Sequence, residues 1–256
     1  MSRLDGRKVL VVGAGTRLTD DPAAPAGNGR AIAITAATEG ATVACADIDV
    51  VAARETATLV RDAGGHAQVV VADVSDPEAC TAMVAEAADL LDGLDGVVVN
   101  VGIGAGRWLG KTSVEEWDHV FDVNVRAHFL TCRAALPLLS DGGSIVLISS
   151  VAGLRPGSTI PAYDASKAAL AGLCRHVAFE GSRRGIRANV VAPGLIDTPL
   201  GRLATAGRPS REKAPVALGR QGTAWEVAKP VTFLLSDEAS YITGAVLPVD
   251  GGLSTL

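Results

Sequence analysis

Short apolar runs alternate along the chain with longer segments in which apolar residues recur at helical spacing. Several of the short runs, such as VLVV and SIVLI, are continuous, without the polar alternation of a strand that faces solvent on one side. Continuous apolar strands are typical of parallel sheets that helices cover on both faces. We therefore expect seven strands, at residues 9–13, 42–47, 67–73, 96–102, 144–150, 186–194 and 245–250.

The segments between these runs have helical patterns. Strands and helices that alternate along a chain predict an α/β fold, here a doubly wound Rossmann-like domain with a seven-stranded parallel sheet and helices on both faces. No linker divides the chain, so residues 1–256 are expected to form one domain. The long irregular segment 195–222 is expected to be a functional or mobile loop. The predicted helices span residues 28–39, 50–63, 76–91, 114–139, 162–184 and 224–235.

Composition narrows the class of protein. The chain is 48% hydrophobic but only 4% aromatic, so its core must consist of alanine, valine, leucine and isoleucine. A net charge of −5 without a basic block argues against a nucleic-acid partner. We expect no membrane span and no secretory signal, because the apolar runs are short. Four cysteines without a CxxC pair and four scattered histidines predict buried thiols in the cytoplasm and no metal site.

The first expected strand runs directly into glycine. Gly13 ends that strand, and Gly27, Asn28 and Gly29 open the next helix, whose free N–H groups and dipole favour a phosphate. Thirteen residues, 14–26, lie between Gly13 and Gly27, where a Gly-x-x-x-Gly-x-Gly turn has three, so ten are extra. A glycine cluster alone is also compatible with an ordinary strand-to-helix turn.

Acidic residues follow the next two strands. Asp47 lies eighteen residues after Gly29, near the distance at which a carboxylate accepts hydrogen bonds from the ribose of a dinucleotide. Such a carboxylate repels a 2′-phosphate, which favours NAD over NADP. The alternative is that Asp47, or Asp49 beside it, only caps the following helix. Asp73 and Val74 are placed at the adenine, although Asp73 is also compatible with a helix cap.

The clearest chemical pattern is YDASK, residues 163–167. Tyr163 and Lys167 are four residues apart, so they share one face of a helix, and an ammonium beside a phenol lowers the pKa of the phenol. Ser150 precedes the tyrosine by thirteen residues and is placed to hold a substrate oxygen. Asn124 is placed to carry a water that links Lys167 to solvent. Each residue alone has an ordinary structural explanation, but the combination predicts acid–base chemistry.

With these residues the chain resembles the compact, single-domain short-chain dehydrogenase/reductases, from about Gly6 to Gly252. The resemblance includes NVG at 100–102, ISS ending at Ser150, APG at 192–194 and the closing ITGAVLPVDGG. It departs from the family at Val12, which replaces a threonine, and in the insertion. The enoyl-reductase branch is disfavoured, because that branch spaces its tyrosine and lysine more widely.

The resemblance implies an enzyme that transfers a hydride between a nicotinamide cofactor and a secondary alcohol or ketone. Tyr163 is then the acid/base, Ser150 positions the substrate oxygen, Lys167 also holds the nicotinamide ribose, and Asn124 supports the proton relay. A homotetramer is also implied. The same resemblance places Asn100 and Gly102 on the adenosine side, and Pro193, Ile196 and Thr198 near the nicotinamide.

Three questions stay open at this level. The insertion is either a surface ornament or a flap from which Arg17 reaches a phosphate oxygen. The function is alternatively that of a 3-oxoacyl-thioester reductase using NADPH, which the lack of a basic residue after Asp47 disfavours. A non-catalytic nucleotide-binding regulator is less expected, because the serine, tyrosine and lysine are intact. The substrate itself is not predicted; its walls are expected at residues 103–110, 151–160 and 195–215.

Overall fold

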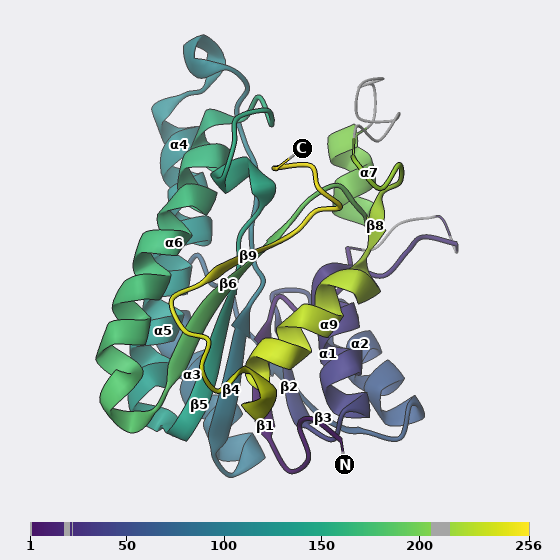
Figure 1. Ribbon diagram of the computed structural model, residues 1–256, viewed down its shortest axis with the longest axis vertical. Helices are drawn as coiled ribbons and strands as arrows, with labels where there is room; N and C mark the ends of the chain where they lie inside the picture. Colours follow the sequence, from purple (N-terminus) through teal and green to yellow (C-terminus); the bar gives the residue numbers. More distant parts are fainter. Residues whose placement is uncertain (1, 18–20, 22, 206–215, 256) are drawn as a thin grey trace.

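The protein folds around one seven-stranded parallel sheet (Figure 1). The computed structural model describes residues 2–17, 21, 23–205 and 216–255. Its strand order is β3-β2-β1-β4-β5-β6-β9, which confirms the predicted doubly wound arrangement. The strands are β1 (Lys8–Val12), β2 (Thr42–Asp47), β3 (His66–Val71), β4 (Leu94–Val99), β5 (Leu139–Ile148), β6 (Arg187–Pro193) and β9 (Val246–Val249).

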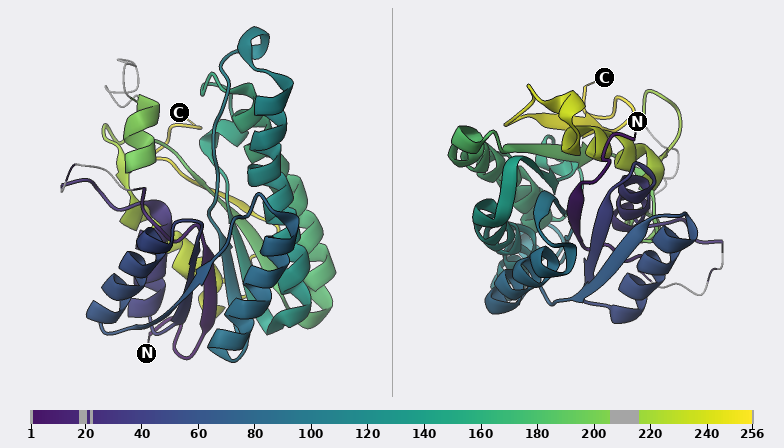
Figure 2. Two further views of the ribbon diagram at one scale, coloured as in Figure 1. Left: turned by 180° about the vertical axis from the view of Figure 1, so that it is seen from behind. Right: turned by 90° about the horizontal axis from the view of Figure 1, so that it is seen from below.

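Two layers of helices cover the sheet, as the view from below in Figure 2 shows. One layer contains α1 (Asn28–Thr38), α2 (Val50–Asp62) and α9 (Ala224–Leu235), and its apolar side chains form one core. The other contains α3 (Pro77–Leu91), α5 (Ala127–Leu138) and α6 (Pro161–Gly181), which form the second core. Both cores are aliphatic, as the composition requires, and the carboxyl ends of the strands point toward the top of Figure 1.

The predicted helix 114–139 is interrupted. It consists of α4 (Val114–Phe121), a π-helical turn (Asp122–Arg126) and α5, and β5 begins at Leu139, five residues before the expected start. Ser113 and Glu116 form a capping box at the start of α4, as its sequence favours. The extra residue of a π-turn barely disturbs apolar periodicity, so the sequence pattern did not indicate it, although such turns are frequent at functional sites.

The expected irregular segment 195–222 contains regular structure in its described parts. Strand β7 (Ile196–Asp197) pairs with β8 (Gly222–Thr223), and α7 (Pro199–Thr205) follows β7. The prediction of a loop was therefore wrong for these residues, because two-residue strands and a two-turn helix are too short to show a period. Residues 206–215, for which a functional or mobile loop is also expected, lie outside the described part of the chain.

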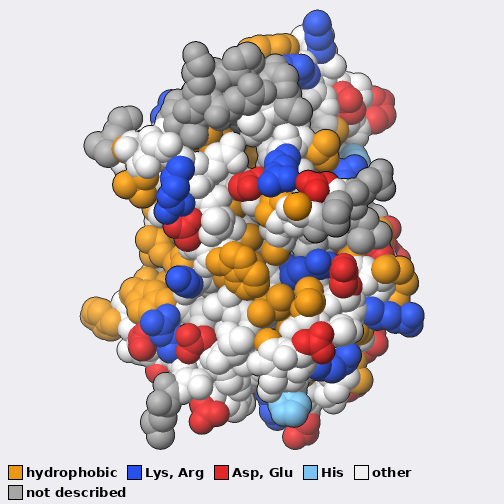
Figure 3. Space-filling view, turned by 90° about the vertical axis from the view of Figure 1, so that its right-hand side faces the viewer, with side chains coloured by type: hydrophobic (Ala, Val, Ile, Leu, Met, Phe, Trp, Pro, Cys, Tyr) orange, Lys and Arg blue, Asp and Glu red, His pale blue; other side chains and the backbone are white. Residues whose placement is uncertain are grey.

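Other expectations concern the surface and the cysteines. No helix of the described chain is long and apolar enough to cross a bilayer. The four cysteines are buried free thiols, as predicted. On the face drawn in Figure 3, acidic and basic side chains of the described residues are interspersed. Ion pairs of the described chain include Arg30 with Glu55 and Arg220 with Glu226.

Candidate active site

The glycine-rich turn after β1 survives the insertion. Gly13 has a φ of +76°, which favours glycine, and the N–H groups of Gly13 and Ala14 both donate to the Ala46 carbonyl. The hydroxyl oxygen of Thr16 accepts a 2.8 Å hydrogen bond from the Gly27 N–H. This bond brings the start of the insertion next to its end, so Gly27 lies close to the turn that Gly13 begins.

The start of α1 has the features of a cofactor cradle. A Cβ at Gly29 would lie 1.8 Å from the Gly13 carbonyl oxygen, so only glycine fits there. The Oδ1 atom of Asn28 is buried without a hydrogen-bond partner, which is costly unless a ligand or water supplies one. A ribose hydroxyl can donate to this oxygen, and a flipped amide presents its N–H group to a phosphate oxygen. The turn therefore fits the diphosphate-linked end of a dinucleotide.

Asp47 and Asp49 have different structural roles. Asp49 caps α2, because its carboxylate accepts from the N–H groups of Val51 and Ala52. Asp47 instead accepts from the N–H groups of Gly15, at 2.8 Å, and Asp49, at 3.1 Å. The alternative in which Asp47 only caps the helix is therefore excluded. The residue after it, Ile48, is 63% exposed and carries no charge.

The residues after β3 are less informative. Asp73 is exposed, and two hydrogen bonds from Ser75 lower the pKa of its carboxyl group. The cap of α3 is Asp76, not Asp73. The Val74 side chain packs against the small apolar cluster that includes Cys80, so contact with a cofactor would fall to its backbone.

The ends of β1 and β4 are tied together beside Lys167. Asn100 donates from Nδ2 to the Gly13 carbonyl at 2.9 Å, and this bond fixes the glycine turn against β4. Gly102 lies so close to Lys167 that a Cβ there would be 2.8 Å from Nζ. Asn100 therefore fixes the backbone near the lysine, and the missing side chain of Gly102 leaves room for Nζ.

Lys167 is almost fully buried. Its Nζ donates to the Ile148 carbonyl at 3.0 Å and to the Val101 carbonyl at 3.4 Å. Burial lowers the pKa of its ammonium to about 8. Nζ lies 5.8 Å from the centroid of the Tyr163 ring, so the cation and the phenol are neighbours, as their four-residue spacing predicts.

Asn124 lies in the π-helical turn and is fully buried. Its amide donates to the Ile103 carbonyl at 2.9 Å and to Ser166 Oγ at 3.0 Å, while its Oδ1 accepts from the Ile103 N–H. Ser166 in turn donates to the Tyr163 carbonyl at 2.8 Å. Asn124 therefore connects the loop after β4 to the helical turn that carries the tyrosine.

Ser150 and Tyr163 are both half-buried. Ser150 follows β5, and its Oγ accepts a hydrogen bond from the Ala152 N–H at 3.2 Å, which leaves the hydroxyl proton out of that bond. The Tyr163 ring lies against the loop after β4, because a Cβ at Gly104 would be 3.9 Å from its Cδ2. Ser149, just before Ser150, donates to the Lys167 carbonyl at 2.7 Å and so ties β5 to α6.

The remaining predicted residues lie along β6, β7 and the insertion. Pro193 ends β6, Ile196 is in β7, and Thr198 accepts from the Gly201 N–H at the start of α7. Arg17 is exposed. The insertion also contacts the region of α7, because Arg202 pairs with Asp21 at 3.3 Å as well as with Asp197 at 2.7 Å.

Sequence reasoning missed three residues that organise this site. Ser149 and Ser166 stand inside the ISS and YDASK motifs, so the motifs contained them without indicating their contacts. Thr16 had no signal, because its partner Gly27 lies eleven residues away across the insertion.

Comparisons with known proteins agree with this geometry. A family model described as "Enoyl-(Acyl carrier protein) reductase" matches residues 23–254. The chain is 35% identical to "2-(S)-hydroxypropyl-CoM dehydrogenase 3" of Xanthobacter autotrophicus over 263 residues, which cover 100% of this chain and 99% of that protein. We conclude that the chain belongs to the short-chain dehydrogenase/reductase family and is an NAD(P)-dependent oxidoreductase of alcohol or ketone substrates.

Solved structures show the same relationship. A short-chain dehydrogenase/reductase from Burkholderia xenovorans has a TM-score of 0.92 at 34% identity, with 100% of this chain and 99% of that chain covered. A structure from Agrobacterium tumefaciens, described as a 2-deoxy-D-gluconate 3-dehydrogenase with bound NADP, has a TM-score of 0.84 at 35% identity, with 97% and 96% covered.

Proposed function

We propose that the protein interconverts a secondary alcohol and a ketone with Tyr163 as the acid/base and with a preference for NAD. The observation that carries this proposal is the buried Lys167 ammonium, 5.8 Å from the centroid of the Tyr163 ring. A buried cation beside a phenol stabilises the phenolate and so prepares the hydroxyl to give and take a proton.

The nicotinamide cofactor supplies or accepts the hydride at the substrate carbon. In the direction of reduction, Tyr163 donates its proton to the carbonyl oxygen, and in oxidation it removes the hydroxyl proton. Ser150 positions that oxygen with the hydroxyl proton not used in its bond to Ala152. Asn124 holds the helical turn of Tyr163 in place and supports a water through which the proton exchanges with solvent. Lys167 also donates to the nicotinamide ribose.

The cofactor is held, in this proposal, by the carboxyl ends of the strands. Gly13, Asn28 and Gly29 receive the diphosphate, and Arg17 reaches a phosphate oxygen from the insertion. Asp73 and Val74 are at the adenine, and Asn100 and Gly102 line the adenosine side. Pro193, Ile196 and Thr198 lie near the nicotinamide, in line with their place along β6, β7 and the start of α7.

The preference for NAD rests on Asp47. Its carboxylate lies at the end of β2 beside the glycine turn, where it accepts from ribose hydroxyls and repels a 2′-phosphate. The residue that follows, Ile48, offers no cation to such a phosphate. Replacing Asp47 with Ser is expected to weaken NAD binding and relax discrimination against NADP. Tighter binding of NADP than of NAD by the wild type would contradict this assignment.

A screen of secondary alcohols and ketones tests the proposal. Nicotinamide absorbance is read with NAD and NADP in parallel, in both directions, for wild type and Tyr163→Phe. We expect turnover with NAD that Tyr163→Phe lowers by about 10²- to 10⁴-fold. Reduction of 3-oxoacyl thioesters alone, with NADPH, would instead favour the alternative reductase, and reduction of a conjugated carbon–carbon double bond would indicate an enoyl reductase. We place the enzyme in the cytoplasm, acting on a small-molecule substrate.

A further inference from the structure

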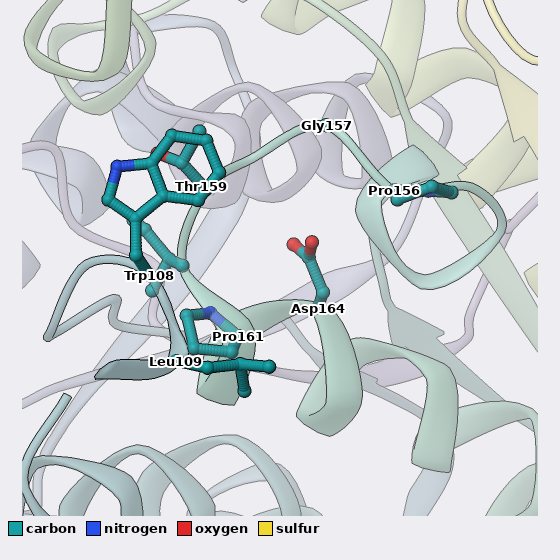
Figure 4. A pocket seen from close by; sticks show the side chains of 8 residues that line it. Trp108, Leu109, Pro156, Gly157, Thr159, Pro161 and Asp164 are labelled. Carbon is teal, nitrogen blue, oxygen red and sulfur yellow. The ribbon is translucent and has the colours of Figure 1, made fainter. Parts of the chain in front are cut away.

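A cavity of about 400 Å³ opens beside the first turn of α6 (Figure 4). Two connections form its walls: the loop between β4 and α4, and the segment that leads from β5 into α6. Most of the lining is apolar, and the one ionisable side chain in it is Asp164. The lining residues are Trp108, Leu109, Pro156, Gly157, Thr159, Ile160, Pro161 and Asp164.

The cavity adjoins the proposed acid/base. Asp164 directly follows Tyr163 in α6, and Ile160 lies one turn before it. Gly104, in the loop after β4, lies close to the start of α6, because a Cβ there would be 3.2 Å from Ile160 Cδ1 and 3.9 Å from Tyr163 Cδ2. A substrate whose reacting carbon lies at Tyr163 therefore has the cavity next to it.

Both walls of the cavity contain a residue with an unusual backbone conformation, and a hydrogen bond joins these two residues. Trp108 and Thr159 have φ values of +59° and +69°, and they are two of the three non-glycine residues with positive φ in the described chain. The Trp108 N–H donates to the Thr159 carbonyl at 2.9 Å across the cavity rim. A β-branched residue in this conformation is an outlier, and such strain persists only where the surroundings over-determine it, typically at ligand sites.

Asp164 lines the cavity with a half-buried side chain. Its Oδ1 is buried and has no hydrogen-bond partner. An acidic residue in the first turn of a helix is ordinarily explained by the helix dipole, but an exposed carboxylate would serve that purpose. Here the carboxylate points into the space between Trp108 and Pro156, as Figure 4 shows. An ionised carboxylate has two oxygens, so one of them can accept a hydrogen bond from a ligand in the cavity.

We propose that this cavity is a distal substrate subsite, in which Asp164 accepts a hydrogen bond from an ammonium or hydroxyl group at the far end of an otherwise apolar alcohol or ketone. The proposal rests on the proposed function and names its substrate class. The carboxylate selects donors and disfavours substrates that end in a carboxylate or sulfonate, because like charges repel in a site of low polarity. Trp108 and Ile160 contact the apolar body.

Four para-substituted acetophenones probe the subsite: the aminomethyl, hydroxymethyl, ethyl and carboxy compounds. Their dissociation constants are measured by calorimetry for wild type and Asp164→Asn, with Asp62→Asn, at an exposed position in α2, as the matched control. We expect Asp164→Asn to weaken binding of the aminomethyl compound about tenfold or more, since a charge-assisted hydrogen bond is lost. Binding of the ethyl compound stays the same, and binding of the carboxy compound improves.

Two further variants separate a subsite from a folding effect. Asp164→Ser shortens the side chain and is expected to reproduce the loss for the aminomethyl compound. Trp108→Ala is expected to weaken all four compounds alike, because it removes apolar contact and not the acceptor. Equal affinity of wild type and Asp164→Asn for the aminomethyl compound would overturn the subsite.

Turnover distinguishes failure of the subsite from failure of the proposed function. We expect kcat/KM for the aminomethyl ketone to fall in Asp164→Asn through KM, while kcat for the ethyl ketone is unchanged. If the four compounds bind in the expected pattern but none is reduced, the subsite stands and the proposed function is wrong. If the ketones are reduced without any dependence on Asp164, the subsite is wrong and the proposed function stands.

Discussion

At the scale of single residues, burial determines the chemistry of Lys167. Water is the best solvent for an ammonium, and the interior replaces it with two carbonyl oxygens, those of Ile148 and Val101. The charged form is therefore disfavoured, and the pKa falls to about 8. Below that pH the Lys167 ammonium keeps its proton, and its charge stabilises the phenolate of Tyr163. Above that pH the lysine is neutral, and this stabilisation is lost.

This pKa leads to a testable prediction. We expect the lysine side chains of the cofactor-free protein, followed by NMR, to include one that titrates near pH 8. The signal should be absent in Lys167→Met and kept in Lys229→Arg, a control at the α9 lysine. An unchanged pH 8 titration in Lys167→Met would show that a different group is responsible.

The residues of the tyrosine motif were predictable because fixed spacing on a helix fixes their geometry. Tyr163 and Lys167 therefore lie beside each other in α6, and Asp47 ends β2, where the apolar run before it predicted a strand end. Asp164 was passed over, although it stands inside the same motif. Its significance depends on Trp108 and Thr159, and contacts of this kind are set by loop conformation, which neither periodicity nor a motif specifies.

At the scale of elements, the glycine turn and the start of α1 act as one unit. The absence of a side chain at Gly29 lets the helix approach within contact of the Gly13 carbonyl. This approach aims the free N–H groups of α1 at the space where a diphosphate is expected. The insertion does not separate the two parts of this unit, because the hydrogen bond between Thr16 and Gly27 joins the start of the insertion to its end.

We therefore expect Gly29→Ala to weaken NAD binding severely, since its Cβ would lie 1.8 Å from the Gly13 carbonyl oxygen and force α1 away. Gly172→Ala is the matched control: this glycine of α6 is exposed, and no atom outside its own helix turn and chain neighbours lies within 4 Å of the added Cβ. It should keep NAD affinity. Calorimetric NAD binding and thermal unfolding are measured for both variants. Normal NAD affinity of Gly29→Ala would contradict the proposal that the start of α1 binds the diphosphate.

The elements differ in how far the sequence predicted them. Apolar runs located all seven strands, and the pattern is clearest in β1, β4 and β6, whose residues are almost all buried. The π-helical turn around Asn124 was missed because its extra residue barely disturbs the apolar periodicity, and α7 was missed because two turns are too few to show a period. Both lie beside the candidate site, where local irregularity positions side chains.

At the scale of the whole molecule, the neighbouring helices α5 and α6 each expose a phenylalanine. Phe129 in α5 is 45% exposed, and Phe179 in α6 is 77% exposed. Large aromatic side chains exposed on adjacent helices are typical of surfaces that associate. This surface supports the predicted homotetramer, in which these helices pair between subunits.

We expect light scattering at micromolar concentration to give the mass of a tetramer. Phe179→Asp should reduce that mass, because a carboxylate would be buried in the interface without a partner. Leu59→Asp, at a leucine of α2 that is 38% exposed, serves as the control and should leave the tetramer intact. A monomeric wild type would contradict the prediction.

Tyr163, as the proton donor and acceptor, is central to the proposed reaction. The most direct measurement compares ketone-dependent oxidation of NADH by wild type and Tyr163→Phe, alongside NADH affinity from fluorescence. The ring remains in the variant and only the hydroxyl is lost, so we expect turnover to fall by about 10²- to 10⁴-fold with NADH affinity nearly unchanged. Turnover of Tyr163→Phe comparable to that of wild type would show that the proton comes from elsewhere.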